Sequence, residues 1–247
     1  NKKVENGRTL LPQMYGDPRG YKYDGEPEWY RYTGNLHTDR LTEIYLWSMK
    51  RSDLERVPTD TGWVGFLEGN NPSYPVQAMQ RDMEHIRRRM ERVRTDQTTA
   101  DTRLADYLLN LVPAETDTLT ELTTGGFFAN GRVWVLHSRL RYFDPVNQRS
   151  GLPQDVAALV EKLTDDSVVV TLVNTNQVAA RTVDVQAGGY GEHQFTGVSW
   201  DGGEKELDSQ TLTVRLEPGS GTKLTLSMKR YVNQPSLAQP WSPAWMN

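Results

Sequence analysis

Residues 167–230 read SVVVTLVNTNQVAARTVDVQAGGYGEHQFTGVSWDGGEKELDSQTLTVRLEPGSGTKLTLSMKR, and this stretch decides the fold. Its first run, 168–173, is apolar at nearly every position, as a central strand buried on both faces is. The later runs alternate apolar and polar residues, which is the period of a half-buried strand. Glycine-rich turns at 188–189, 201–203 and 218–221 supply the positive φ angles of tight reversals. We read the stretch as an antiparallel β-sandwich.

The residues before this module follow a helical period instead. Pro75 opens the clearest helix, at a position where its fixed φ angle is preorganised. The apolar residues that follow are spaced 3, 4, 3, 4 and 3 apart, so they form one stripe that we expect to pack on neighbouring helices. These residues are Val76, Met79, Met83, Ile86, Met90 and Val93. Further helices are expected from Thr38 to a point before Pro58, at 104–111 and at 114–124.

The order of these patterns predicts an α+β fold, in which an N-terminal helical layer, or part of an α/α toroid, precedes the antiparallel β-sandwich. We divide the chain into residues 1–130, with aromatic-rich loops and helices, and residues 131–247, the sandwich domain. The second part is expected to begin with a strand at 132–143. The spacing of apolar residues predicts a short helix at 153–164, and a tail rich in Pro and Trp ends the chain.

Composition excludes several classes of function. A net charge of -4 argues against nucleic acid as a partner, because phosphate binding needs a basic surface. No run of 18 or more apolar residues is present, so we expect no membrane span. The absence of Cys excludes disulfides and thiolate chemistry and fits an exported bacterial protein as well as a cytosolic one. A start at Asn1 without a signal-like segment favours a processed chain or a piece of a longer one, and export is slightly favoured.

The first candidate binding residues lie in a stretch that is rich in aromatic residues and carboxylates. Trp29, Tyr30 and Tyr32 offer stacking faces beside acids, the composition of sugar-binding clefts. Trp63 and Glu68 lie in a glycine-rich stretch that we read as a loop able to approach a ligand closely, and Glu68 is the first acid to test for catalysis. The alternative is that these aromatic residues only anchor the chain or fill a core, while Glu68 is solvated.

A second candidate site lies in the run GGYGEHQF at 188–195. Its three glycines would let one turn present Tyr190, Glu192 and His193 together. In a lyase-like site His193 or Tyr190 would move a proton while Glu192 orients the imidazole. The alternative is a turn that only seals the sandwich. The four histidines show no metal-ligand spacing and no EF-hand pattern occurs, so we assign no metal residues and the cofactor stays unknown.

The runs VVVTLVNTN at 168–176, RTVDVQ at 181–186 and LTVRLEPGSGTKLTL at 212–226 resemble a β-sandwich found at the C-terminus of many carbohydrate-active enzymes. The resemblance covers about the last 80 residues and includes no catalytic motif. It implies part or a subunit of a glycoside hydrolase or polysaccharide lyase-like enzyme, with a carbohydrate ligand and a second polypeptide or a preceding catalytic domain. Two alternatives stay open: a non-catalytic glycan-binding or assembly module, and a self-contained hydrolase of unknown substrate.

Overall fold

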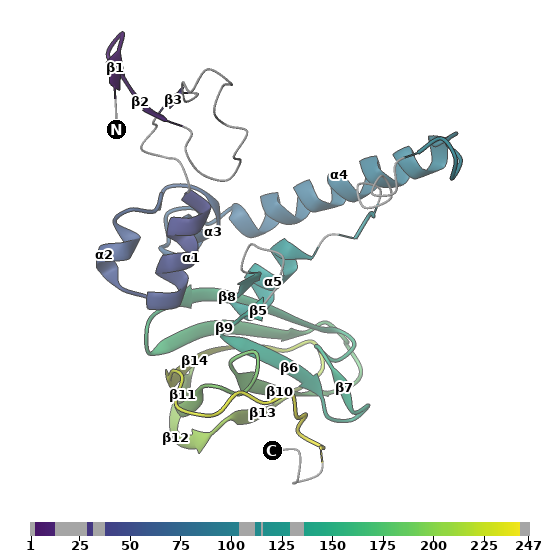
Figure 1. The fold of residues 1–247 in the computed structure, drawn as a ribbon. Helices are drawn as coiled ribbons and strands as arrows, with labels where there is room; N and C mark the ends of the chain where they lie inside the picture. The colour runs from purple at the N-terminus through teal and green to yellow at the C-terminus, as the bar shows by residue number, and fades with distance from the viewer. Residues whose placement is uncertain are drawn as a thin grey trace.

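The computed structural model describes residues 3–12, 29–31, 38–103, 112–114, 116–128 and 136–242. In these residues helices precede a β-rich half, so the predicted α+β class is confirmed (Figure 1). A small antiparallel sheet comes first, with strands β1 (Lys3–Glu5), β2 (Arg8–Pro12) and β3 (Trp29–Arg31). The boundary expected at residue 130 and the helix expected at 104–111 lie outside the described residues.

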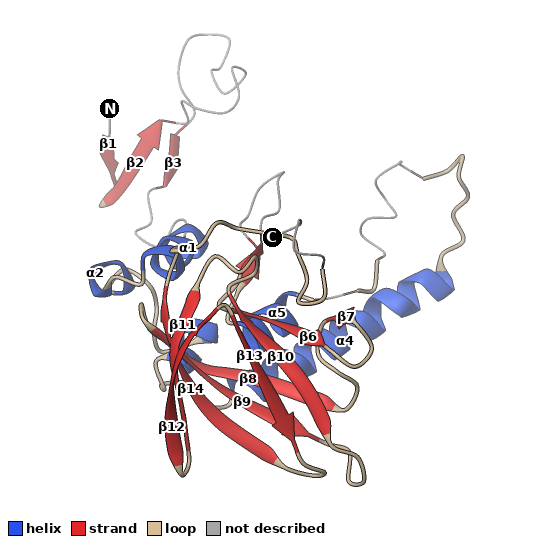
Figure 2. Cartoon of the chain, turned by 90° about the horizontal axis from the view of Figure 1, so that it is seen from below, coloured by secondary structure: helices blue, strands red, loops and turns tan. Residues whose placement is uncertain are grey.

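The β-rich half consists of a five-stranded and a four-stranded antiparallel sheet (Figure 2). The larger sheet has the order β12-β11-β14-β9-β8 and the smaller one β13-β10-β6-β7. The strands are β6 (Leu140–Asp144), β7 (Arg149–Ser150), β8 (Val156–Leu163), β9 (Ser167–Asn174), β10 (Arg181–Ala187), β11 (Gln194–Trp200), β12 (Gly203–Ser209), β13 (Thr211–Leu216) and β14 (Gly221–Lys229).

The core of this half lies between the two sheets. On β9, Val168, Val170 and Leu172 are fully buried, and on β10 the same holds for Val183 and Val185. The alternate residues of β9 point to the outer face of the sheet and are partly buried. The helical layer lies over this face and shields it in part from solvent. β9 pairs with β14 on one side and with β8 on the other, so its prediction as a central strand is confirmed.

The short helix predicted at 153–164 is wrong, because this segment forms β8. The register slips between Val160 and Lys162, which leaves Glu161 as an extra residue opposite β9. A bulge of this kind shifts the alternation by one, so Val160 and Leu163 both point inward three residues apart. That spacing imitates a helix, and only pairing with β9 distinguishes the two structures.

The single strand predicted at 132–143 is also wrong. The described part contains two strands, β5 (Leu136–His137) and β6, separated at Ser138 and Arg139. β5 pairs with β4 (Phe127–Phe128), whereas β6 pairs with β10 and β7. The chain therefore passes from one sheet to another at this break, and Arg139 lies between the two strands.

The helical layer contains α1 (Thr38–Ser48), α2 (Arg51–Leu54), α3 (Gly62–Leu67) and α5 (Asp117–Thr124). Met49, at a φ of 55°, separates α1 from α2. The glycine-rich loop predicted around Trp63 is instead α3. A Cβ at Gly65 would lie 3.1 Å from the carbonyl oxygen of Thr59, so glycine serves close packing there. The helical and sheet residues contribute to one continuous hydrophobic core.

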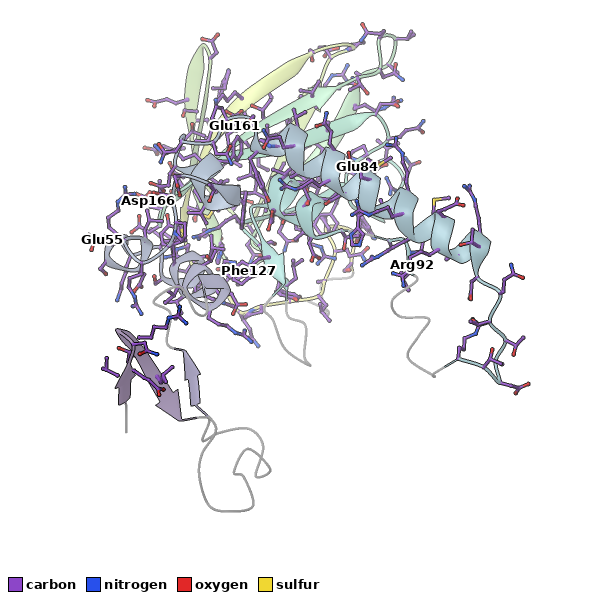
Figure 3. The ribbon with its side chains drawn as sticks, turned by 90° about the horizontal axis from the view of Figure 1, so that it is seen from above. Glu55, Glu84, Arg92, Phe127, Glu161 and Asp166 are labelled. Atoms are coloured by element: carbon purple, nitrogen blue, oxygen red, sulfur yellow. The ribbon has the colours of Figure 1, made fainter. Side chains whose placement is uncertain are left out.

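The long helix α4 (Tyr74–Thr95) extends away from the sandwich, as Figure 3 shows for the segment bearing Glu84 and Arg92. The helix begins at Tyr74, one residue before the predicted start at Pro75, so the proline lies in its first turn as expected. Its predicted packing is wrong for much of the stripe: Val76 is 63% exposed and Met83 44% exposed. No helix in the described residues is long and apolar enough to cross a membrane.

In the tail, Trp241 packs edge-on against Phe143 at 5.8 Å.

Candidate functional site

A cleft of about 760 Å³ lies between the helical layer and the outer face of the larger sheet. Helices α1 to α3 form one wall, and β8, β9 and β14 form the other. Apolar side chains such as Phe66 and Val169 alternate there with charged ones. The charged residues on the sheet wall follow from the fold, because the outer face of an antiparallel sheet carries polar side chains where it meets solvent.

Glu68, the acid singled out from the sequence, lies in the helical wall of this cleft. Its Oε2 accepts a hydrogen bond from Nη1 of Arg51 at 2.7 Å. The Tyr45 hydroxyl donates to its Oε1 at 3.4 Å. Burial, reinforced by the neighbouring Glu68 carboxylate, raises the pKa of Tyr45 to about 12, so this phenol keeps its proton. Glu68 is therefore an ion-paired acid with a fixed orientation.

Glu161 faces the same cleft from the sheet wall (Figure 3). It is the extra residue of the bulge in β8, and bulges often redirect a side chain in this way. Lys223 and Thr171 both donate hydrogen bonds to its carboxylate. Burial alone would raise the pKa of Glu161, but these two hydrogen bonds hold it below the usual range. Glu161 is thus a carboxylate that stays charged at neutral pH.

The charges that line the cleft balance. Three cations, Arg51, Lys162 and Lys223, are matched by three acids, Glu68, Glu161 and Asp165. Two of these acids are held in ion pairs, so the cleft offers oriented donors and acceptors without a strong net field. Such a surface suits a neutral ligand that carries many hydroxyl groups.

A second cluster of polar side chains surrounds His137, His193 and Tyr231. The Tyr231 hydroxyl is 3.2 Å from Nε2 of His137, and its backbone N–H donates to Nδ1 of His193 at 3.1 Å. The ring of Trp47 lies 4.3 Å from that of His137. We call these four residues, with Arg139, the histidine cluster.

Both imidazoles of the histidine cluster are neutral at physiological pH. Burial, followed by the charge of Arg139, lowers the pKa of His137 to about 3 and that of His193 to about 4. Arg139 is itself fully buried, and burial lowers its pKa to about 10. The cluster therefore carries its positive charge on the guanidinium alone.

The predicted trio at the 188–195 turn is brought together only in part. Oε2 of Glu192 accepts a hydrogen bond of 2.7 Å from the backbone N–H of Tyr190. Its Oε1 lies 3.8 Å from Nε2 of His193, too far for a hydrogen bond. The backbone of Tyr231, rather than Glu192, orients the imidazole. The catalytic roles of Tyr190, Glu192 and His193 stay predictions.

The aromatic residues predicted to bind substrate are mostly not placed at either site. Trp29 and Tyr30 belong to β3, of which only the backbone is described, and Tyr32 lies outside the described residues. Trp63 is 6% exposed and belongs to the core, so its ring is covered in this conformation. No group of three or more potential metal-ligating side chains occurs within the described ranges.

Residues 29–120 match a family model described as a domain of unknown function (DUF8034). The matched segment runs from β3 into α5, so it covers less than half of the chain and leaves out the sandwich. Comparison with curated proteins and with solved structures gave no match. The geometry of the site therefore carries the functional argument.

Sequence reasoning missed several residues that the fold brings together. Arg139, Tyr231 and Trp47 belong to no motif, and each lies far along the chain from the other two. Glu161 was hidden by the helical reading of β8. Of the histidine cluster only His193 was predicted from the sequence, through the glycine-rich run at 188–195.

Proposed function

We propose that this chain serves a carbohydrate-active enzyme by providing a glycan-binding wall and a C-terminal sandwich. The supporting observation is the charge-balanced cleft between α1–α3 and the sheet, with Glu68 on one wall and Glu161 on the other. Fixed carboxylates accept hydrogen bonds from sugar hydroxyls, and apolar residues such as Phe66 contact the CH faces of the rings. Because the lining charges cancel, the preferred ligand is a neutral glycan.

The cleft favours binding over bond cleavage. Glycoside hydrolysis needs one carboxylic acid whose pKa is raised, so that it can protonate the leaving group. The pKa of Glu161 is lowered instead, and Glu68 is ion-paired with Arg51. In this proposal the catalytic acids belong to a second polypeptide or to a preceding domain of toroid type.

Affinity electrophoresis through gels that contain neutral or acidic polysaccharides tests this function. The chain should be retarded by at least one neutral polysaccharide, and Glu68→Gln and Glu161→Gln should weaken that retardation about tenfold, as loss of a hydrogen bond to a charged group does. The matched control is Glu217→Gln, which removes an exposed acid paired with Arg215 far from the cleft. Equal retardation of all three variants and the parent would exclude the cleft.

A hydrolysis assay on the same polysaccharides accompanies the gels. If the isolated chain forms product, the proposed binding role is contradicted and the alternative of a self-contained hydrolase is supported. No product, together with retardation, supports the proposal.

The second candidate is an assembly module, and the observation that favours it is the exposed stripe of α4. Val76, Met83, Met90 and Val93 leave a large apolar face uncovered in the described residues. In this reading α4 docks a catalytic subunit. Light scattering on material from the native source should then give a mass above 28.1 kDa, and Met83→Glu should reduce it to that of one chain. A parent mass of 28.1 kDa would remove this candidate.

A further inference from the structure

We infer that the histidine cluster binds a small carboxylate anion on the guanidinium of Arg139, at a site separate from the glycan cleft. The inference does not depend on the proposed function, because Arg139 does not line that cleft. It assigns a ligand to a group of buried donors that the cleft leaves unused.

The first argument is the state of Arg139. Its side chain is 0% exposed, and Nε, Nη1 and Nη2 are all buried without a hydrogen-bond partner. Removing a guanidinium from water is costly unless its donors are satisfied and its charge is matched. Because these nitrogens have no partner in the protein, they can donate to a bound anion. The planar fork of an arginine matches the two oxygens of a carboxylate.

The two histidines add unpartnered atoms next to this cation. Nε2 of His193 and Nδ1 of His137 are also buried without a hydrogen-bond partner. Because Nδ1 of His193 accepts the N–H of Tyr231, its proton in the neutral form lies on Nε2, which is then a free donor. The positive charge of Arg139 acts on both rings. The cluster thus offers hydrogen-bond donors beside a buried cation.

Within the described residues no carboxylate forms an ion pair or a hydrogen bond with Arg139, and among the acids only the charge of Asp165 acts on it from a distance. Arg230 is a second guanidinium near Arg139. It donates to the backbone oxygens of Asp165, Trp47 and Ser48 and lies over the ring of Tyr231, with no ion pair to a carboxylate among the described residues. Glu192, the acid nearest to His193, is turned toward the N–H of Tyr190. Two neighbouring cations without an ion pair create a positive potential that attracts an anion.

Access to the cluster is controlled by two half-exposed rings. Tyr231 is 47% and Trp47 43% exposed, and the two rings stack with a centroid distance of 6.3 Å. Tyr231 also has a φ of 55°, a conformation that costs energy for a residue other than glycine. A rotation of the Tyr231 side chain would connect the cluster with solvent. Acetate is the probe of choice, because its carboxylate presents two oxygens to the guanidinium fork.

The test is the stability of the folded chain as acetate replaces perchlorate at constant ionic strength. A ligand that binds only the folded state stabilises it in proportion to the logarithm of its concentration once the site is occupied. The midpoint of urea unfolding of the parent should rise with acetate. Arg139→Met should abolish this response. Arg215→Met, which removes an exposed arginine, should retain it.

Two outcomes overturn the inference. One is an equal acetate response in the parent and in Arg139→Met, which indicates a general salt effect. The other is an Arg139→Met chain that is more stable than the parent at every acetate concentration, because an unliganded buried cation is destabilising. Should that variant not fold, equilibrium dialysis of the parent with labelled acetate decides: saturable binding of one acetate per chain supports the site, and its absence rejects it.

Discussion

The Tyr74 hydroxyl donates a hydrogen bond of 2.6 Å to Oε2 of Glu121, and this contact joins the first turn of α4 to α5. Burial raises the pKa of Tyr74 and also that of Glu121. The long helix is thus attached to the helical layer by a polar contact at its base, and farther along it Arg89 donates to the carbonyl oxygens of Val112 and Ala114. The contact at the base fixes where α4 leaves the helical layer.

Removing the Tyr74 hydroxyl should therefore destabilise the chain. We expect Tyr74→Phe to lower the free energy of unfolding by about 1 to 3 kcal/mol, because a buried carboxylate loses its donor. In Glu121→Gln the same Tyr74→Phe change should cost less, since a neutral amide is cheaper to leave unpaired. Urea unfolding of the four proteins in this cycle measures the difference, and equal costs in both backgrounds would contradict the coupling.

Gly188 should be intolerant of a side chain. Its φ is +88°, and an added Cβ would lie 2.4 Å from a carboxylate oxygen of Glu192. We expect Gly188→Ala to cost more than about 2 kcal/mol, from backbone strain and displacement of Glu192 together. Gly202→Ala is the control, because its φ is +101° but no atom lies within 4 Å of the added Cβ. A comparable loss at the two sites would mean that Glu192 yields freely.

The histidine cluster should make the fold sensitive to acid. The pKa values of His137 and His193 are lowered to about 3 and about 4, so the unfolded chain binds more protons than the folded chain below the ordinary histidine pKa. Stability is therefore complete above about pH 6.5 and falls as the pH drops toward 4. His193→Gln should reduce this loss. The check is urea unfolding at pH 7 and pH 5, with His85→Gln on α4 as the control. An equal loss of unfolding free energy between these pH values in both variants would argue against the role of His193.

The exposed stripe of α4 should contribute little to the stability of the isolated chain. Met83 is 44% exposed, so Met83→Gln should change the free energy of unfolding by no more than about 0.5 kcal/mol. Ala78, on the buried face of the same helix, should behave differently: Ala78→Leu overfills its site and should cost about 1 to 3 kcal/mol. Thermal unfolding compares the two, and a large loss at Met83 would show that the stripe is covered in solution.

Local pattern was sufficient for the elements that obey one period throughout. The alternation in β9 and β14 identified these strands, because it reports contacts that repeat every two residues. The proline in the first turn of α4 and the apolar stripe after it identified the long helix. The pattern failed at β8, where the bulge at Glu161 places Val160 and Leu163 on one face. It failed again at α3, where Gly65 serves helix packing.

The candidate sites divide in the same way. Glu68 and the 188–195 turn were recognisable from residue type and neighbouring glycines. Glu161 on the opposite wall of the cleft was not, since its direction depends on an irregularity in strand pairing. The partners of His193 were equally hidden, because Tyr231 reaches it from the end of β14 and Arg139 from the break before β6.

By itself, the sequence determined the α+β class, the central strand and the long helix, since apolar periodicity is a property of neighbouring residues along the chain. Only the tertiary structure decided which face of α4 stays exposed, where the cleft opens and which groups surround Arg139. The physical reason is that burial and charge pairing depend on segments distant in sequence. Their energies exist only after the sheets and helices have packed together.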